Sequence, residues 1–261
     1  MSEGWDAIKR QLEAELGEPV TVDALTGDWR IAQRAAGHRH SADDVLTAYY
    51  ALAHADAAAL ALDLGTGIGG VGLLVLWGLR AAKLVCVEAQ DISVRLLRAN
   101  IAGNQLEERV EAHHGDLRTF DSPLRFELIT GSPPYFPVGT GIVPADSQKA
   151  HARFELRGDV NDYARTAARL LRDDGVFVFC FPTPQRERAL AAVDRAGLEP
   201  IAYRDVIPRV GLRPLFTLFA ARLASGAVGA GRADPPLTVR EHDGSLSDEM
   251  RAVRRRFGFT D

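Results

Sequence analysis

A glycine-rich loop follows the apolar segment 58–64, where the sequence reads DLGTGIGG from position 63 to position 70. Glycine lets a backbone turn sharply and lets a ligand approach it closely, so this spacing is typical of a nucleotide-binding loop. The pattern G-x-G-x-x-G occurs twice, which leaves a dinucleotide site open. The aspartate before the loop favours a cationic ligand over a pyrophosphate, because like charges repel. The candidate binding residues of the loop are Asp63, Gly65, Thr66, Gly67 and Gly69.

Two further acidic residues follow predicted strands. Glu88, with Ala89 beside it, comes about 20 residues after the loop, where an acidic side chain can accept both ribose hydroxyls of a nucleotide. Asp116, followed by Leu117, ends the next strand. Ligands of open α/β sheets bind at the carboxyl ends of the strands, so we expect both acids beside the glycine loop, with Asp116 near an adenine amino group.

A rigid corner follows the apolar segment 126–131 and reads Ser132-Pro133-Pro134-Tyr135. Two prolines remove two backbone donors and fix two φ angles, so the chain can continue neither as a paired strand nor as a helix. The corner is therefore expected to hold the serine and the tyrosine in fixed positions.

Strand-like segments alternate with helix-period segments between residues 58 and 222, which predicts βαβ units and a mostly parallel sheet. Only the short segment RVGLR at 209–213 connects the last two strands, too short for a parallel crossover, so these strands should form an antiparallel hairpin. A helix is expected from residue 42, capped by Ser41 with Asp44 three positions on. The expected strands are 58–65, 82–90, 110–116, 126–132, 175–182, 201–209 and 214–223; the expected helices include 71–80, 93–103, 161–172, 184–196 and a short terminal helix within 245–259.

The composition is that of an ordinary globular protein, with 46% hydrophobic and 25% charged residues and no apolar run long enough to span a bilayer. No signal peptide is recognisable, and a cytoplasmic location is expected. Cys86 and Cys180 lie in predicted strands, where we expect buried thiols and no disulfide. The net charge of −4 supplies no global attraction for a polyanion, so any nucleic-acid site must be a local patch.

In order and spacing, DLGTGIGG, Glu88, GDL and SPPY resemble the class I S-adenosylmethionine-dependent methyltransferases over residues 37–222. The resemblance implies a Rossmann-like, three-layer α/β/α fold whose seven-stranded, mostly parallel sheet ends in an antiparallel hairpin. It divides the chain into a helical cap segment 1–55, a catalytic domain 56–222, and a linker with a C-terminal extension 223–261. It also implies S-adenosylmethionine as cofactor, with Asp63 and Gly65–Gly69 around its amino acid part, Glu88 at the ribose, and Asp116 with Leu117 at the adenine.

The rigid corner matches the [N/D/S]-P-P-[Y/F/W] motif of enzymes that methylate exocyclic amines or amides. In such a site the Ser132 hydroxyl and the Pro133 carbonyl accept hydrogen bonds from the amine and favour pyramidal nitrogen as positive charge develops. Tyr135, helped by Phe136, offers a flat face to a base taken out of its stack. Serine departs from the asparagine of most adenine-N6 and glutamine enzymes and is familiar in cytosine-N4 enzymes acting on DNA, which leaves the base open. The expected catalytic residues are Ser132, Pro133, Pro134 and Tyr135.

The segment QRAAGHRHSADDVLTA resembles the stretch before the glycine loop in the bacterial tRNA(Val) adenine-N6 methyltransferase family, which implies a tRNA substrate. It would place Arg39 and Asp43 over the cofactor, although a capping cluster around Ser41 explains them as well. Phe136, Lys149 and Arg153 are candidate RNA contacts, with solvated surface charge as the alternative for the two cations. His38 and His40 lack the cysteines or carboxylates that would complete a metal site, so no metal is expected.

Several alternatives remain open on sequence alone. A protein glutamine N5-methyltransferase shares the motif, but such enzymes carry a separate N-terminal helical domain, for which residues 1–55 leave little room. A DNA amino-methyltransferase shares the fold. A nicotinamide-dependent oxidoreductase would use the glycine loop but gives the proline corner no role. A noncatalytic RNA-binding relative would have lost the cofactor. The oligomeric state, the target nucleotide and the order of segment 139–152 without substrate stay undetermined.

Overall fold

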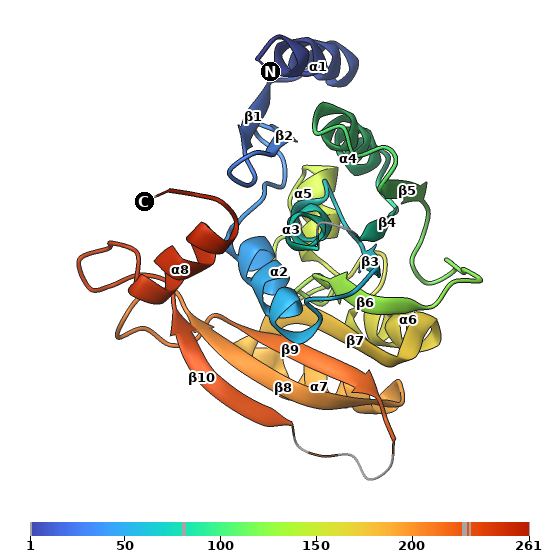
Figure 1. Ribbon diagram of the computed structural model, residues 1–261, viewed down its shortest axis with the longest axis vertical. Helices are drawn as coiled ribbons and strands as arrows, with labels where there is room; N and C mark the ends of the chain where they lie inside the picture. The colour runs from blue at the N-terminus through green and yellow to red at the C-terminus, as the bar shows by residue number, and fades with distance from the viewer. Residues whose placement is uncertain (1, 80–81, 226–228, 230, 261) are drawn as a thin grey trace.

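The computed structural model describes residues 2–79, 82–225, 229 and 231–260. The expected helix end at Arg80 and part of the expected linker lie outside these residues. An eight-stranded sheet forms the centre of the molecule, with strand order β10-β8-β9-β7-β6-β3-β4-β5 (Figure 1). The strands are β3 (Leu60–Leu64), β4 (Lys83–Glu88), β5 (Val110–His114), β6 (Phe126–Gly131), β7 (Leu171–Pro182), β8 (Leu198–Ile207), β9 (Phe216–Leu223) and β10 (Arg232–Thr238).

Strands β5, β4, β3, β6 and β7 are parallel neighbours, whereas β9 pairs antiparallel with both β7 and β8. The α/β fold and the antiparallel hairpin are thus confirmed. The expected number of seven strands was wrong, because the C-terminal extension returns to the sheet as β10 and pairs parallel with β8. Pro235 and Pro236 conceal this strand in the sequence; they lie where its register shifts, at the sheet edge that tolerates proline.

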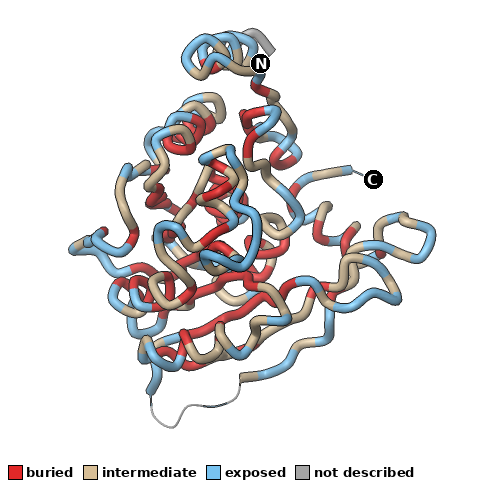
Figure 2. Tube along the Cα trace, turned by 180° about the vertical axis from the view of Figure 1, so that it is seen from behind, coloured by how far each residue is buried: buried red, intermediate tan, exposed pale blue. Residues whose placement is uncertain are grey.

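Helices cover both faces of the sheet, as the three-layer prediction requires. Helices α2 (Ala42–His54), α3 (Gly70–Gly78) and α4 (Asp91–Gly103) share one apolar core with the sheet, and α6 (Val160–Leu170) and α7 (Arg186–Arg195) share the other. Along β7 the side chains alternate between the two cores, with Phe177, Phe179 and Phe181 on one side and Val178 and Cys180 on the other. Figure 2 shows the buried residues concentrated along the sheet and the helix faces against it.

Two local predictions differ in outcome. The capping box of α2 is confirmed, since the Ser41 N–H donates to Asp44 Oδ2 at 3.0 Å. The expected helix 161–172 ends earlier, at Leu170, and the residues before the expected strand 175–182 belong to β7, which begins at Leu171. The register of β7 with β6 shifts between Phe126 and Leu128, so residues 172–175 bulge within the strand.

The N-terminal segment contains a hairpin that was not predicted, formed by β1 (Val20–Ala24) and β2 (Arg30–Arg34) after helix α1 (Ser2–Leu16). Fully buried Asn100 of α4 connects the hairpin to the glycine loop. Its side chain accepts from the Ala32 N–H at 2.6 Å and donates to the carbonyls of Ala32 and Ile68. The remaining elements are α5 (Ser147–Arg153), a 3₁₀ turn η1 (Thr183–Gln185) and α8 (Asp248–Arg256). No helix among the described residues has the length and apolar character needed to cross a membrane.

Candidate active site

Four parallel strands, β6, β3, β4 and β5, end side by side, and the loops after them surround one cavity. Eleven of the sequence-predicted residues line it: Arg39, Asp63, Gly65, Thr66, Gly67, Glu88, Ala89, Asp116, Leu117, Ser132 and Pro134. The cavity lining does not include Asp43, Gly69, Pro133, Tyr135, Phe136, Lys149 or Arg153. The sheet edge therefore brings the glycine loop, both acidic strand ends and the serine of the proline corner together.

The glycine loop needs its glycines for different reasons. Gly65, Gly67 and Gly69 all have positive φ angles, of 59°, 58° and 95°. A Cβ atom on Gly65 would lie 2.0 Å from the Tyr163 hydroxyl oxygen, so the loop packs tightly there. A Cβ atom on Gly67 would meet nothing within 4 Å, so at this position the backbone borders open space in the cavity.

Asp63 holds the glycine loop in place through hydrogen bonds of its side chain. Its buried carboxylate accepts hydrogen bonds from Thr66 Oγ1 at 2.5 Å, from Thr130 Oγ1 at 2.7 Å and from the Gly72 N–H at 3.0 Å. Burial raises the pKa of Asp63 to about 6, although these three donors favour the charged form. Asp63 thus fixes the shape of the loop and adds a negative charge to the cavity wall.

Glu88 is the last residue of strand β4, and backbone N–H groups donate hydrogen bonds to both of its carboxylate oxygens. Oε2 accepts from the Gly67 N–H at 2.9 Å, and Oε1 accepts from the Gln90 N–H at 2.7 Å. Burial raises the pKa of this carboxyl above its ordinary value. Each oxygen accepts one of these bonds and can accept a further one, which is the capacity that two ribose hydroxyls require.

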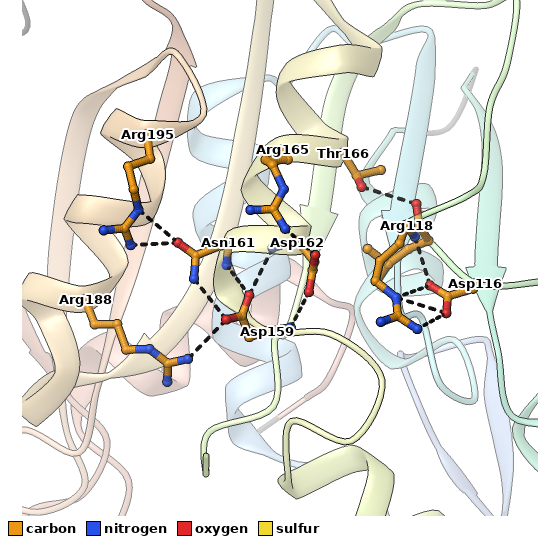
Figure 3. A network of polar contacts seen from close by, with 10 residues as sticks. Asp116, Arg118, Asp159, Asn161, Asp162, Arg165, Thr166, Arg188 and Arg195 are labelled. Carbon is orange, nitrogen blue, oxygen red and sulfur yellow. Dashed lines mark hydrogen bonds and ion pairs between the residues drawn. The ribbon is translucent and has the colours of Figure 1, made fainter. Parts of the chain in front are cut away.

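Asp116 is held by Arg118, as Figure 3 shows. The guanidinium donates to both carboxylate oxygens, at 3.0 and 3.1 Å from Nε and at 2.5 Å from Nη2. This bond lowers the pKa of Asp116 and keeps it charged. The carbonyl of neighbouring Leu117 accepts from Thr166 Oγ1 of α6 at 3.2 Å, which fixes the backbone at the adenine end of the predicted site.

The same view shows how α6 begins. Asp159 caps the helix by accepting from the N–H groups of Asn161 and Asp162 at 2.8 and 3.1 Å, and Arg188 and Arg195 of α7 bind Asp159 and Asn161 (Figure 3). One turn later, Tyr163 packs against Gly65 and lines the cavity. The polar network between the two helices therefore positions the side chain that supports the glycine loop.

The proline corner is anchored from three sides. The Tyr135 hydroxyl donates to Asp43 Oδ2 at 3.3 Å and lies 3.2 Å from Cys180 Sγ, whose thiol donates to Ser132 Oγ at 3.6 Å. Gln185 Nε2 donates to the Tyr135 carbonyl at 2.8 Å. Burial raises the pKa of Tyr135 well above its ordinary value, so the phenol stays protonated. Ser132 reaches the cavity, while the Tyr135 hydroxyl is bonded behind the cavity wall.

The segment before α2 covers one side of the cavity. The Arg39 guanidinium binds Thr21 Oγ1 and Asp23 Oδ2 of the hairpin, each at 3.0 Å, so β1 holds this side chain in place. His40 Nδ1 lies 3.0 Å from Asp44 Oδ2. Asp44 lines the cavity in place of the predicted Asp43, which faces Tyr135 instead. Within the described residues no group of three or more histidine, cysteine or acidic side chains is arranged to hold a metal ion.

Sequence reasoning missed several residues of the cavity. Gln148 of α5, 2% exposed, accepts from the His38 N–H at 3.1 Å and from Arg34 Nη1 at 3.1 Å and donates to Ser93 Oγ at 3.2 Å. It joins α5, α4 and the segment before α2 across the cavity. Tyr163 was missed as well; the only signal for it was its place in the first turn of an expected helix.

Comparisons with known proteins agree with this geometry. Residues 44–152 match the family model described as the methyltransferase small domain. The chain is an S-adenosylmethionine-dependent methyltransferase that is similar over these residues to the small-domain family. It is 29% identical over 163 residues to a protein of Phocaeicola vulgatus (62% of this chain, 68% of the relative) and 29% identical over 199 residues to one of Tolumonas auensis (75% and 80%). Each relative is named tRNA1(Val) (adenine(37)-N6)-methyltransferase.

Solved structures support the fold of this methyltransferase. A predicted O-methyltransferase of Agrobacterium tumefaciens superimposes with a TM-score of 0.63 at 18% identity, covering 82% of this chain and 96% of that one. The tRNA m1G37 methyltransferase of M. jannaschii superimposes with a TM-score of 0.54 at 13% identity, covering 79% and 55%.

The methyltransferase uses S-adenosylmethionine, and its cavity fits that cofactor. Open space borders Gly67, where a side chain would intrude, and four acidic residues line the wall around a ligand that carries positive charge: Asp44, Asp63, Glu88 and Asp116. When bound, the cofactor supplies a methyl group on a positively charged sulfur.

Proposed function

We propose that this methyltransferase acts on the exocyclic N6 amine of an adenine in tRNA. The observation that carries the proposal is the position of Ser132, which directly follows strand β6 and lines the cofactor cavity beside the glycine loop. The 29% identity to two proteins named tRNA1(Val) (adenine(37)-N6)-methyltransferase supports adenine 37 of such a tRNA as the target.

The corner residues would act by placing the amine. An adenine amino nitrogen is a poor nucleophile because its lone pair is delocalised into the ring. Ser132 Oγ and the Pro133 carbonyl would accept its two hydrogens and favour the pyramidal nitrogen that develops positive charge. The cluster of Cys180, Tyr135 and Asp43 behind the serine fixes where that hydroxyl points. Proximity and orientation then provide most of the acceleration, without a strong base.

The predicted RNA contacts lie outside the cavity, on the surface beside it. The Phe136 side chain is 45% exposed and packs against Phe154, with ring centroids 5.5 Å apart. Lys149 and Arg153 lie on α5, whose other residues Gln148 and His151 line the cavity. We propose that Phe136 meets a base and that the two cations meet phosphates.

We further propose residues 56–222 as the catalytic domain, flanked by the cap 1–55 and the extension 223–261. A cytoplasmic location follows from the proposed substrate.

A methyl-transfer assay tests the function. The full chain is incubated with labelled S-adenosylmethionine and, separately, with tRNA, ribosomal RNA, DNA and protein from a strain that lacks this gene. We expect label in tRNA that is released as N6-methyladenosine after nuclease digestion. Label only in protein would identify a glutamine methyltransferase, and N4-methylcytosine in DNA would identify the DNA enzyme that the serine resembles; either result rejects the proposal.

A further inference from the structure

The exposed apolar side chains are gathered on two loops. Of the eight large apolar side chains that are exposed in the described part of the chain, seven lie in segments 136–156 and 208–215. We call the first segment the corner loop, since it follows the proline corner, and the second the β8–β9 turn. The corner loop carries Phe136, Val138, Ile142, Val143 and Leu156, and the β8–β9 turn carries Leu212 and Leu215, 56% and 60% exposed.

Both segments form polar contacts with residues 183–188, which follow strand β7. On one side, Gln185 binds the Tyr135 carbonyl and Arg188 pairs with Glu155 of the corner loop at 2.6 Å. On the other side, the Thr183 N–H donates to the Leu215 carbonyl at 3.2 Å. The β8–β9 turn also lies at the carboxyl edge of the sheet, because Pro182 at the end of β7 pairs with Phe216 at the start of β9. The two segments therefore flank the same edge as the cavity.

Each segment carries two cations that form no ion pair with the described residues, although the charge of Lys149 helps to lower the pKa of nearby Asp146. Lys149 and Arg153 of the corner loop, and Arg209 and Arg213 of the β8–β9 turn, form no side-chain hydrogen bond or ion pair with any residue that the structure describes. The neighbouring turn 240–246 carries Glu241 and Asp243, and in the described part of the chain neither carboxylate forms an ion pair with Arg209 or Arg213; Asp243 accepts from the Ser245 N–H at 2.8 Å. In a chain of net charge −4, four unpaired cations beside one cavity form a local positive patch.

We infer that the β8–β9 turn is a second RNA-binding element, opposite the corner loop, which holds unpaired nucleotides next to the target base. The inference rests on the proposed function. Leu212 and Leu215 offer apolar surface to the faces of splayed bases, and Arg209 and Arg213 reach the phosphates between them. Apolar and cationic side chains alternate along this turn, which suits a single strand with exposed base faces better than a duplex, whose bases are stacked inside. An apolar patch for a protein partner would not need the unpaired arginines.

The test compares charge variants of the full chain in binding and in turnover. R209A/R213A should raise the tRNA dissociation constant about tenfold and reduce the slope of log K against log salt by about 1.4, since each phosphate contact on a single strand contributes about 0.7. The kcat at saturating tRNA and the affinity for S-adenosylmethionine should stay unchanged, because neither arginine lines the cavity. R209K/R213K keeps the charges and should keep the slope.

The matched control, R10A/R98A, removes two exposed arginines from α1 and α4, which lie away from β8 and β9 (Figure 1), and should leave tRNA binding unchanged. If the wild-type chain methylates tRNA, and R209A/R213A binds tRNA as tightly as wild type with the same salt slope, this inference is wrong. The proposed function is then still supported. A wild-type chain that neither binds nor methylates tRNA would overturn both.

Discussion

The hydroxyl of Tyr135 donates a hydrogen bond to the carboxylate of Asp43 at 3.3 Å, joining residues 92 positions apart in the sequence. Asp43 lies in the first turn of α2, and Tyr135 ends the proline corner. Burial and the neighbouring charge of Asp44 raise the pKa of Asp43, so a protonated phenol is a suitable partner. The orientation of the corner thus depends on a helix outside the parallel strands that build the cavity.

Tyr135 should affect turnover through its ring more than through its hydroxyl. Tyr135→Ala removes the ring that packs against Phe181 behind Ser132, with ring centroids 6.1 Å apart, so the proline corner should lose its fixed position and kcat should fall about 100-fold, as misplaced reactants cause. Tyr135→Phe keeps the ring and loses only the bonds to Asp43 and Cys180, so a loss of about fivefold is expected. Steady-state kinetics with tRNA measure both, and calorimetric titration should give cofactor affinities within a few-fold of wild type. Equal loss of turnover and cofactor affinity in Tyr135→Ala would instead mean that the residue supports the fold.

The residues that follow strands could be placed from the sequence. The glycine loop, Glu88, Asp116 and Ser132 each end a recognisable apolar segment, and parallel strands bring such ends to one edge. The hairpin β1–β2 could not be predicted, because its strands are short and β2 buries the polar residues Gln33 and Arg34 beside its apolar ones. Strand β10 could not be predicted, because it is mostly exposed and is interrupted by two prolines. Gln148 gave no signal either, since its three partners lie 55 to 114 residues away in the sequence.

Alanine substitutions at Gly65 and Gly67 should affect the free energy of unfolding and the cofactor affinity to different extents. Gly67→Ala places a methyl group in open space at positive φ, so we expect a loss of about 1 kcal/mol in the free energy of unfolding and a loss of cofactor affinity of tenfold or so, because the methyl group borders the cavity. Gly65→Ala also meets the Tyr163 hydroxyl and should cost more stability. Urea denaturation and cofactor titration measure the two effects. A Gly67→Ala chain that binds the cofactor normally would show that the loop does not contact it.

Asp63 should make the fold more stable at low pH. Its pKa is about 6 in the fold against an ordinary 3.8, so between these values the folded chain holds a proton that the unfolded chain has released. The contribution of Asp63 to the free energy of unfolding should therefore fall by about 3 kcal/mol as pH rises from about 4 to about 6. Asp63→Asn cannot ionise, so the stability of wild type minus that of the variant should decrease over this interval in urea titrations. A difference that is constant with pH would contradict the raised pKa.

Arg34 should contribute both to the free energy of unfolding and to the shape of the cavity, because it joins the cap segment to α5. Its side chain is buried and binds Glu18 at 2.6 Å, Asp146 at 2.7 Å and the cavity residue Gln148 at 3.1 Å. Arg34→Ala leaves two carboxylates without their partner and should lower the free energy of unfolding by about 2 kcal/mol, less than for a fully buried pair because both carboxylates are partly exposed to water.

The Arg34 variant should also weaken cofactor binding several-fold, since Gln148 loses one of the partners that hold it across the cavity. Arg95→Ala is the matched control: its ion pair with Asp91 has a similar length, 2.7 Å, but both side chains are about half exposed, so a change within about 0.5 kcal/mol is expected. Amide hydrogen exchange gives an independent measurement, because freeing Asp146 from Arg34 should speed exchange of the Lys149 and Ala150 amides at the start of α5. If the Arg34→Ala and Arg95→Ala chains have equal stability and equal cofactor affinity, the contacts of Arg34 with Glu18, Asp146 and Gln148 do not stabilise the cavity.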